Sequence, residues 1–110
     1  MQTIRLSKQE VDILNSLKRR TKINHWNVLC RMAFCESCRE QSDPQVFGDI
    51  KNDSNVELDW ATFAGEQTEI YMSLVIRHKE LYAPNRLEPE HFRRLLFRGI
   101  FLLKEKIGKK

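Results

Sequence analysis

The sequence predicts a mainly α-helical protein that folds as a single domain over residues 1–110. Three observations lead to this fold class. Apolar residues recur at helical spacing in four stretches, alternation with a period of two is confined to a few residues near the start, and turn-forming residues gather in one central segment. We therefore expect a strand and two helices over residues 1–40, a loop-rich acidic segment over 41–65, and two further helices over 66–110. A core of this size is often completed by association, so we expect a homo-oligomer.

The first element is a short strand over residues 3–6, in which Ile4 and Leu6 face inward and Arg5 faces outward. A lone strand leaves backbone donors and acceptors unpaired, so it needs a partner. One candidate is the same strand of a second copy, antiparallel about a two-fold axis, which gives a ribbon-helix-helix-like N-terminal half. The other candidate is an extended piece of the same chain near residues 56–60. The fold class that we predict includes the ribbon shared by two copies.

Two helices follow the strand. Ser7 and Glu10 have the spacing of a capping box, and this starts a helix with an apolar stripe at Ile13, Leu14 and Leu17. Residues 21–24 form the turn after it. Asn24 is a favourable N-cap for a second helix from about His25 to Glu40. Its expected core stripe consists of Trp26, Leu29, Cys30, Ala33 and Phe34.

The last two helices lie beyond the central loop. One is expected from about Glu66 to Leu81 and ends before Pro84. Its inward residues are expected to be Ile70, Leu74, Val75, His78 and Leu81. The other begins near Glu88, where acidic residues suit the helix dipole, and continues to about Ile107. Its broad apolar face consists of Phe92, Leu95, Leu96, Gly99, Ile100 and Leu103, while Phe97 and Phe101 add apolar surface on another side and predict a second interface.

Charge is segregated along the chain. Residues 1–31 hold seven lysines and arginines against two acids, residues 32–69 hold two against nine, and residues 70–110 hold ten against four. Two basic ends thus flank an acidic middle, a distribution that favours an anionic partner such as nucleic acid. The alternative is that these charges belong to solvated helix faces.

The basic residues near the first interhelical turn are the candidate site. Arg5, on the outer face of a ribbon, could reach base edges in the major groove, and the start of the second helix suits a phosphate. Phosphate contacts position a protein without reading sequence, so we expect recognition of DNA backbone or structure. The candidate DNA-binding residues are Arg5, Lys8, Lys18, Arg19, Arg20, Lys22, Asn24 and His25.

Other classes of protein find less support. No run of about 18 apolar residues predicts a membrane helix, the polar start does not resemble a signal peptide, and an odd number of cysteines favours a reducing, cytoplasmic setting. Cys30, Cys35 and Cys38 have the spacing of some iron–sulfur ligands, but a fourth cysteine is missing and the spacing falls in a helix. We expect no cofactor, no metal and no catalytic activity of this chain alone.

Several stretches resemble one known family. TIRLSKQ over residues 3–9, LKRRTKINHWNVLCRMA over 17–33 and ELDWATFAGE over 57–66 are similar to DndE, the small protein of bacterial DNA phosphorothioation systems. The most specific part is the T-x-I-x-x-W-N-x-L-C-R run over residues 21–31. The resemblance covers nearly the whole chain.

The resemblance implies a role as well as a family. In such systems a non-bridging oxygen of the DNA backbone is replaced by sulfur, with an iron–sulfur sulfurtransferase-like protein and an ATPase-like protein as partners. It implies a homo-tetramer that binds double-stranded DNA, nicked DNA in particular. Three alternatives stay open: a ribbon-helix-helix transcriptional repressor, an interaction subunit that does not bind DNA, and a nicking enzyme.

Overall fold

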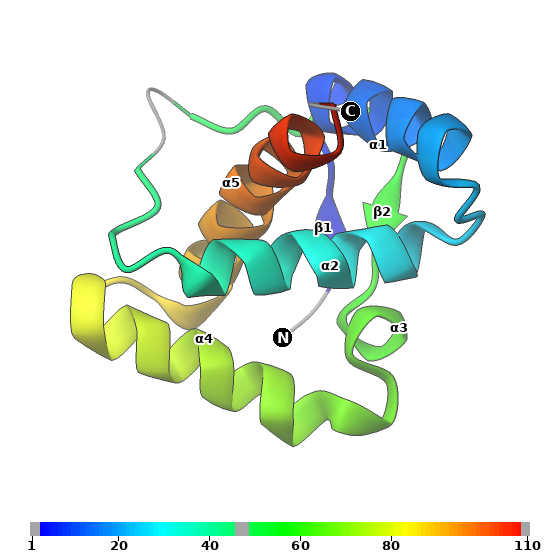
Figure 1. The fold of residues 1–110 in the computed structure, drawn as a ribbon. Helices are drawn as coiled ribbons and strands as arrows, with labels where there is room; N and C mark the ends of the chain where they lie inside the picture. Colours follow the sequence, from blue (N-terminus) through cyan, green and yellow to red (C-terminus); the bar gives the residue numbers. More distant parts are fainter. Residues whose placement is uncertain (1–2, 46–48, 109–110) are drawn as a thin grey trace.

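The computed structural model describes residues 3–45 and 49–108. Within them the chain forms a two-stranded sheet and a set of helices packed around the crossing of α2 and α5, with α1 and α4 on opposite sides of α2 (Figure 1). The elements are β1 (Ile4–Arg5), α1 (Lys8–Thr21), α2 (Trp26–Arg39), β2 (Glu57–Leu58), α3 (Trp60–Ala64), a 3-10 turn η1 (Gly65–Gln67), α4 (Thr68–Tyr82) and α5 (Glu88–Gly108). The mainly helical fold class is confirmed.

The N-terminal strand pairs inside its own chain. β1 is antiparallel to β2, with Ile4 opposite Leu58 and Arg5 opposite Glu57. The N–H of Leu6 extends the ladder by donating to the carbonyl of Val56 at 3.0 Å. The strand therefore pairs with an extended piece of the same chain, which was the second of the two candidate partners. Because β1 has a partner within the chain, an unpaired strand is no longer a reason to expect a ribbon shared by two copies.

The start of the second helix differs from the prediction by one residue. α1 begins with the expected capping box, in which the Glu10 N–H donates to Ser7 Oγ at 3.2 Å and the Ser7 N–H donates to Glu10 Oε1 at 2.8 Å. α2, however, has His25 as its N-cap, with no capping hydrogen bond from the side chain. The prediction of Asn24 as N-cap is therefore wrong.

The predicted inward face of the third long helix is wrong in part. Val75 and His78 are buried, but Ile70, Leu74 and Leu81 are 57%, 38% and 56% exposed. The sequence reading missed α3, whose Phe63 fills the core beneath α4, where it contacts the ring of Tyr71 at a centroid distance of 5.2 Å. With Tyr71, Met72, Val75 and His78 turned toward that core, Ile70, Leu74 and Leu81 face outward.

A glycine allows the two central helices to approach closely. Gly99 in α5 lies against the backbone of Ala33 in α2, and a Cβ atom at Gly99 would fall far inside contact distance of the Ala33 carbonyl oxygen. Glycine costs a helix interior about 1 kcal/mol relative to alanine. The close packing of α2 on α5 explains why that cost is tolerated here.

Two buried histidines join three parts of the fold. His78 Nε2 donates to the Glu40 carbonyl at 3.0 Å, so its Nδ1 accepts from His91 Nε2 at 2.9 Å. The Nδ1 atom of His91 then accepts from Arg86 Nη1 at 3.1 Å, and Arg86 also pairs with Asp43. Both rings must be neutral for this chain of hydrogen bonds. Burial, followed by the charge of the other histidine and of Arg86, lowers the pKa of His91 to about 4, and burial lowers the pKa of His78.

Because the two buried histidines are neutral, we expect the protein to lose stability in acid. An unfolded histidine titrates near pH 6.5, so above that pH the neutral rings impose no penalty on folding. As the pH falls from 6.5 toward 4, the unfolded chain takes up protons that folded His91 refuses, and the free energy of unfolding falls by about 3 kcal/mol from this residue. Urea unfolding between pH 7 and 4 measures the loss. A His91→Gln variant, less stable at pH 7, should lose this part of the pH dependence; an unchanged dependence would contradict the assignment.

Candidate nucleic-acid interface

The turn between α1 and α2 has a defined backbone conformation. Lys22 ends α1 in the left-handed region, with a φ of 63°, and its N–H donates to the Lys18 carbonyl at 3.0 Å. The hydroxyl of Thr21 donates to the Leu17 carbonyl at 2.7 Å and accepts from the Ile23 N–H at 3.2 Å. These bonds fix the direction in which the chain leaves α1 and thus the position of the basic residues around it.

Four cations gather at this turn, and we call them the basic turn: Lys18, Arg19, Arg20 and Lys22. Arg19, Arg20 and Lys22 are exposed, while Lys18 is half-buried with its Nζ 5.9 Å from the centroid of the Trp26 ring. Within the part of the chain that the structure describes, none of the four forms an ion pair with a carboxylate. Their charge is therefore available to an external anion.

The end of α5 adds a cation that the sequence reading did not place here. Arg20 and Lys104 line one hollow between α1 and α5, which also includes Ser16 and Gly108. The C-terminal end of α5 lies beside α1 in Figure 1. The signal for this was the positive charge of residues 70–110, but charge along a sequence does not reveal which helix ends meet.

Two of the predicted residues lie away from the basic turn. Lys8 is at the opposite end of α1, about 20 Å away along a helix of this length. Arg5 is held by the sheet, because its Nη1 donates to the Ser54 carbonyl at 3.1 Å and its Nη2 lies 3.7 Å from a Glu57 oxygen. The structure therefore does not bring Arg5 and Lys8 into one surface with the other candidates.

Asn24 and His25 remain next to the basic turn. Both are exposed, and they join Lys22 to the first turn of α2. The His25 carbonyl accepts from the Val28 N–H at 3.1 Å, but no side chain caps the start of this helix. A helix start without a side-chain cap presents backbone N–H groups that favour negative charge, and here the surrounding cations act in the same direction.

Two of the three cysteines have the properties of packing residues, because Cys30 is buried and Cys38 is half-buried, whereas Cys35 is exposed. All three lie on α2, and burial raises the pKa of Cys30 and of Cys38 to about 12 and raises the pKa of Cys35 as well. They are therefore thiols at neutral pH in the metal-free chain. Among residues 3–45 and 49–108, no three His, Cys, Asp or Glu side chains are grouped as a metal site would require.

None of the described helices has both the length and the apolar composition needed to cross a membrane.

Comparison with known proteins yields one family, and the similar solved structures include two of DndE. The family model for the DNA sulphur modification protein DndE matches residues 3–109. A crystal structure of DndE from Escherichia coli B7A, involved in DNA phosphorothioation modification, is 23% identical with a TM-score of 0.71, over 94% of this chain and 96% of that chain. A crystal structure of a DndE mutant involved in DNA phosphorothioation is 24% identical with a TM-score of 0.67, over 96% and 98% of the two chains. No curated protein matches the chain.

Proposed function

The chain belongs to the DndE family of DNA sulphur modification proteins, as its sequence resemblance indicated, and on this premise we propose that it is a DNA-binding subunit of the phosphorothioation machinery. The observation that carries this proposal is the basic turn, a group of four cations at a backbone turn of fixed conformation that have no carboxylate partner among the described residues. Cations that are free of intramolecular ion pairs can neutralise phosphates and release counterions when DNA binds.

The same surface favours recognition of backbone over sequence. Arg5, a candidate base reader, is engaged by Ser54 and Glu57 in the sheet. The basic turn and the start of α2 offer contacts to phosphates, which position a protein but carry no sequence information. A nick allows the backbone to bend around such a surface, so we propose a preference for nicked duplex. A ribbon-helix-helix repressor is less compatible with the pairing of β1 to β2.

The proposed setting is a complex in the bacterial cytoplasm. The chain would act on DNA together with the iron–sulfur sulfurtransferase-like and ATPase-like proteins of such systems, without catalysing a step alone. We also propose that it assembles as a homo-tetramer. The exposed apolar residues of α4 supply one candidate surface for assembly, and the half-buried Phe97 and Phe101 of α5 supply another.

Charge reversal at the basic turn tests the DNA-binding surface. We expect the triple variant Lys18→Glu, Arg19→Glu, Lys22→Glu to lose detectable binding to nicked duplex in a gel-shift assay, because three phosphate contacts become repulsive. Circular dichroism should show the helix content of the wild type. The matched control is Lys51→Glu, Arg77→Glu, which reverses two exposed cations elsewhere and should bind within about threefold of the wild type. Retained binding by the triple variant would refute this surface.

A substitution at Lys22 should change the stability of the fold and the affinity for DNA in opposite directions. Its left-handed backbone favours glycine, so Lys22→Gly should raise the free energy of unfolding by about 0.5–1 kcal/mol. The same change removes one phosphate contact, so affinity for nicked duplex should fall several-fold. Chemical denaturation and fluorescence anisotropy at one salt concentration measure the two effects. Affinity that rises together with stability would show that Lys22 does not contact DNA.

A further inference from the structure

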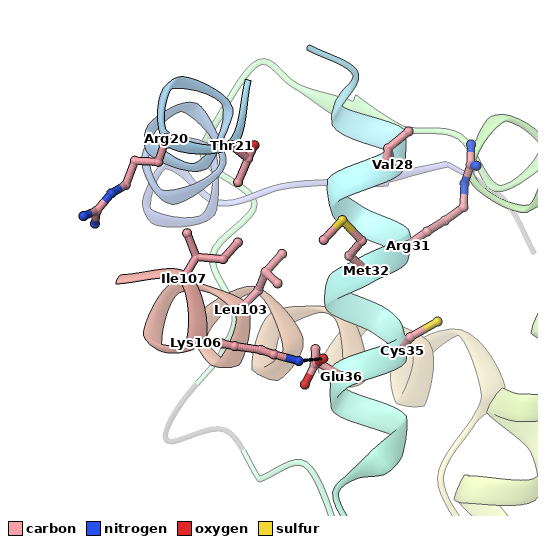
Figure 2. Close-up of a pocket in the computed structure, with 10 residues that line it drawn as sticks. All are labelled: Arg20, Thr21, Val28, Arg31, Met32, Cys35, Glu36, Leu103, Lys106 and Ile107. Carbon is pink, nitrogen blue, oxygen red and sulfur yellow. Dashed lines mark hydrogen bonds and ion pairs between the residues drawn. The ribbon is translucent and has the colours of Figure 1, made fainter. Parts of the chain in front are cut away.

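The hollow between α1 and the last turns of α5 has a volume of about 400 Å³, and we call it the α1–α5 hollow. The residues that line it are Ile13, Ser16, Leu17, Arg20, Lys104, Glu105 and Gly108. Figure 2 shows the Arg20 side chain extended away from α2. A Cβ atom at Gly108 would lie 3.7 Å from Arg20 Nη1, so the guanidinium of Arg20 lies at the end of α5.

The fold gives no structural reason for the charge of Lys104. The cation in the last turn of α5 is Lys106, and it is this lysine that binds Glu36, at 2.8 Å (Figure 2). Lys104 precedes that turn, where the helix dipole has little effect, and no acidic residue stands three or four positions from it. Lys104 is exposed, and among the described residues no carboxylate forms an ion pair with it. Its charge is therefore available to an external anion.

The donors around the α1–α5 hollow suit a phosphate of a nucleic-acid backbone. Arg20 offers a planar fork of N–H donors, Lys104 a point charge and Ser16 a hydroxyl. Because Glu105 opposes the two cations on the same rim, a free phosphate ion would gain little net attraction. Arg20 also belongs to the basic turn, so DNA held there would bring further phosphates to the hollow at a high effective concentration.

We propose that Arg20 and Lys104 bind a second stretch of the DNA backbone in the α1–α5 hollow, so that the duplex extends from the basic turn across α1 to the last turns of α5. Lys104 lies about 6 Å before Gly108 along the helix axis, and the head of Arg20 lies beside Gly108. The two head groups are therefore within reach of one phosphate or of two neighbouring ones. This inference rests on the proposed DNA-binding function and adds residues to its surface.

Neutral substitutions at three consecutive residues of α5 test the contact. In Lys104→Gln, the slope of log affinity for nicked duplex against log salt concentration should become shallower by about 0.9, because one phosphate contact is lost. The matched control, Lys106→Gln, removes the same charge on the side of Glu36 and should leave the slope unchanged. Glu105→Gln removes the opposing carboxylate and should raise the affinity several-fold. All three side chains are exposed, so folding should survive, and circular dichroism checks this.

The outcomes separate this inference from the proposed function. Equal effects of Lys104→Gln and Lys106→Gln would mean that only net charge matters, and an unchanged slope in Lys104→Gln would mean that no phosphate lies there. Either result overturns the α1–α5 contact while the gel-shift test of the basic turn still stands. Wild-type protein that does not bind nicked duplex would overturn the proposed function and, with it, this inference.

Photo-cross-linking gives a test that does not depend on charge. In a Cys35→Ser, Cys38→Ser background, Lys104→Cys labelled with an azidophenacyl group should cross-link to nicked duplex at least fivefold more than Lys106→Cys with the same label. Replacing chloride by inorganic phosphate at constant ionic strength should not reduce the cross-linking. Equal cross-linking from the two positions would contradict the proposed path of the duplex. Loss of cross-linking in inorganic phosphate would mean that the hollow takes a free anion and would also overturn the proposal.

Discussion

A buried ion pair between Glu10 and Arg93 holds the frame on which the site is built. Glu10 is 0% exposed, and Arg93 Nη1 donates to its Oε2 at 2.8 Å. The same carboxylate completes the capping box with Ser7, and Arg93 Nη2 also donates to the Arg5 carbonyl. One pair thus joins β1, the start of α1 and the N-terminal part of α5. Removing one partner of such a pair costs about 3–5 kcal/mol, because the other charge stays buried. With its start fixed to α5, the far end of α1 carries the basic turn to the C-terminal end of α5.

The cations of the basic turn have two possible explanations, an effect on their own helix and contact with a partner. Cations in the last turn of a helix stabilise it by about 0.3–1 kcal/mol each through the helix dipole, so Lys18, Arg19 and Arg20 need no ligand to explain their presence. Lys22 is different. It occupies a left-handed position where glycine or asparagine would fold more readily, and a residue kept in a costly conformation suggests a role outside folding. This separates the DNA-binding account from the view that the cations form only a solvated helix face.

Local signals predicted local structure well. The capping box at Ser7, the apolar stripe of α1 and the extent of α5 could all be read from residue spacing. The pairing partner of β1 could not be predicted from residue spacing. A second copy of the strand and an extended piece of the same chain would both satisfy its backbone groups, and only packing decides between them. The outward stripe of α4 was misassigned for a related reason: its apolar residues exceed one face, and the missed helix α3 determines which of them are buried. In the candidate site, Lys18 to His25 lie together because they are adjacent in the sequence. The positions of Arg5 and Lys8 relative to them depend on the fold, so the sequence could not predict them.

The central claim is that the basic turn contacts the DNA backbone, and the salt dependence of binding tests it most directly. Affinity for one nicked duplex should be measured from 50 to 300 mM salt for the wild type and for a variant with Lys18, Arg19 and Lys22 changed to Gln. Each phosphate contact contributes about 0.9 to the slope of log affinity against log salt concentration, so the neutral variant should have a slope shallower by about 2.7. Equal slopes for the two proteins would contradict the account.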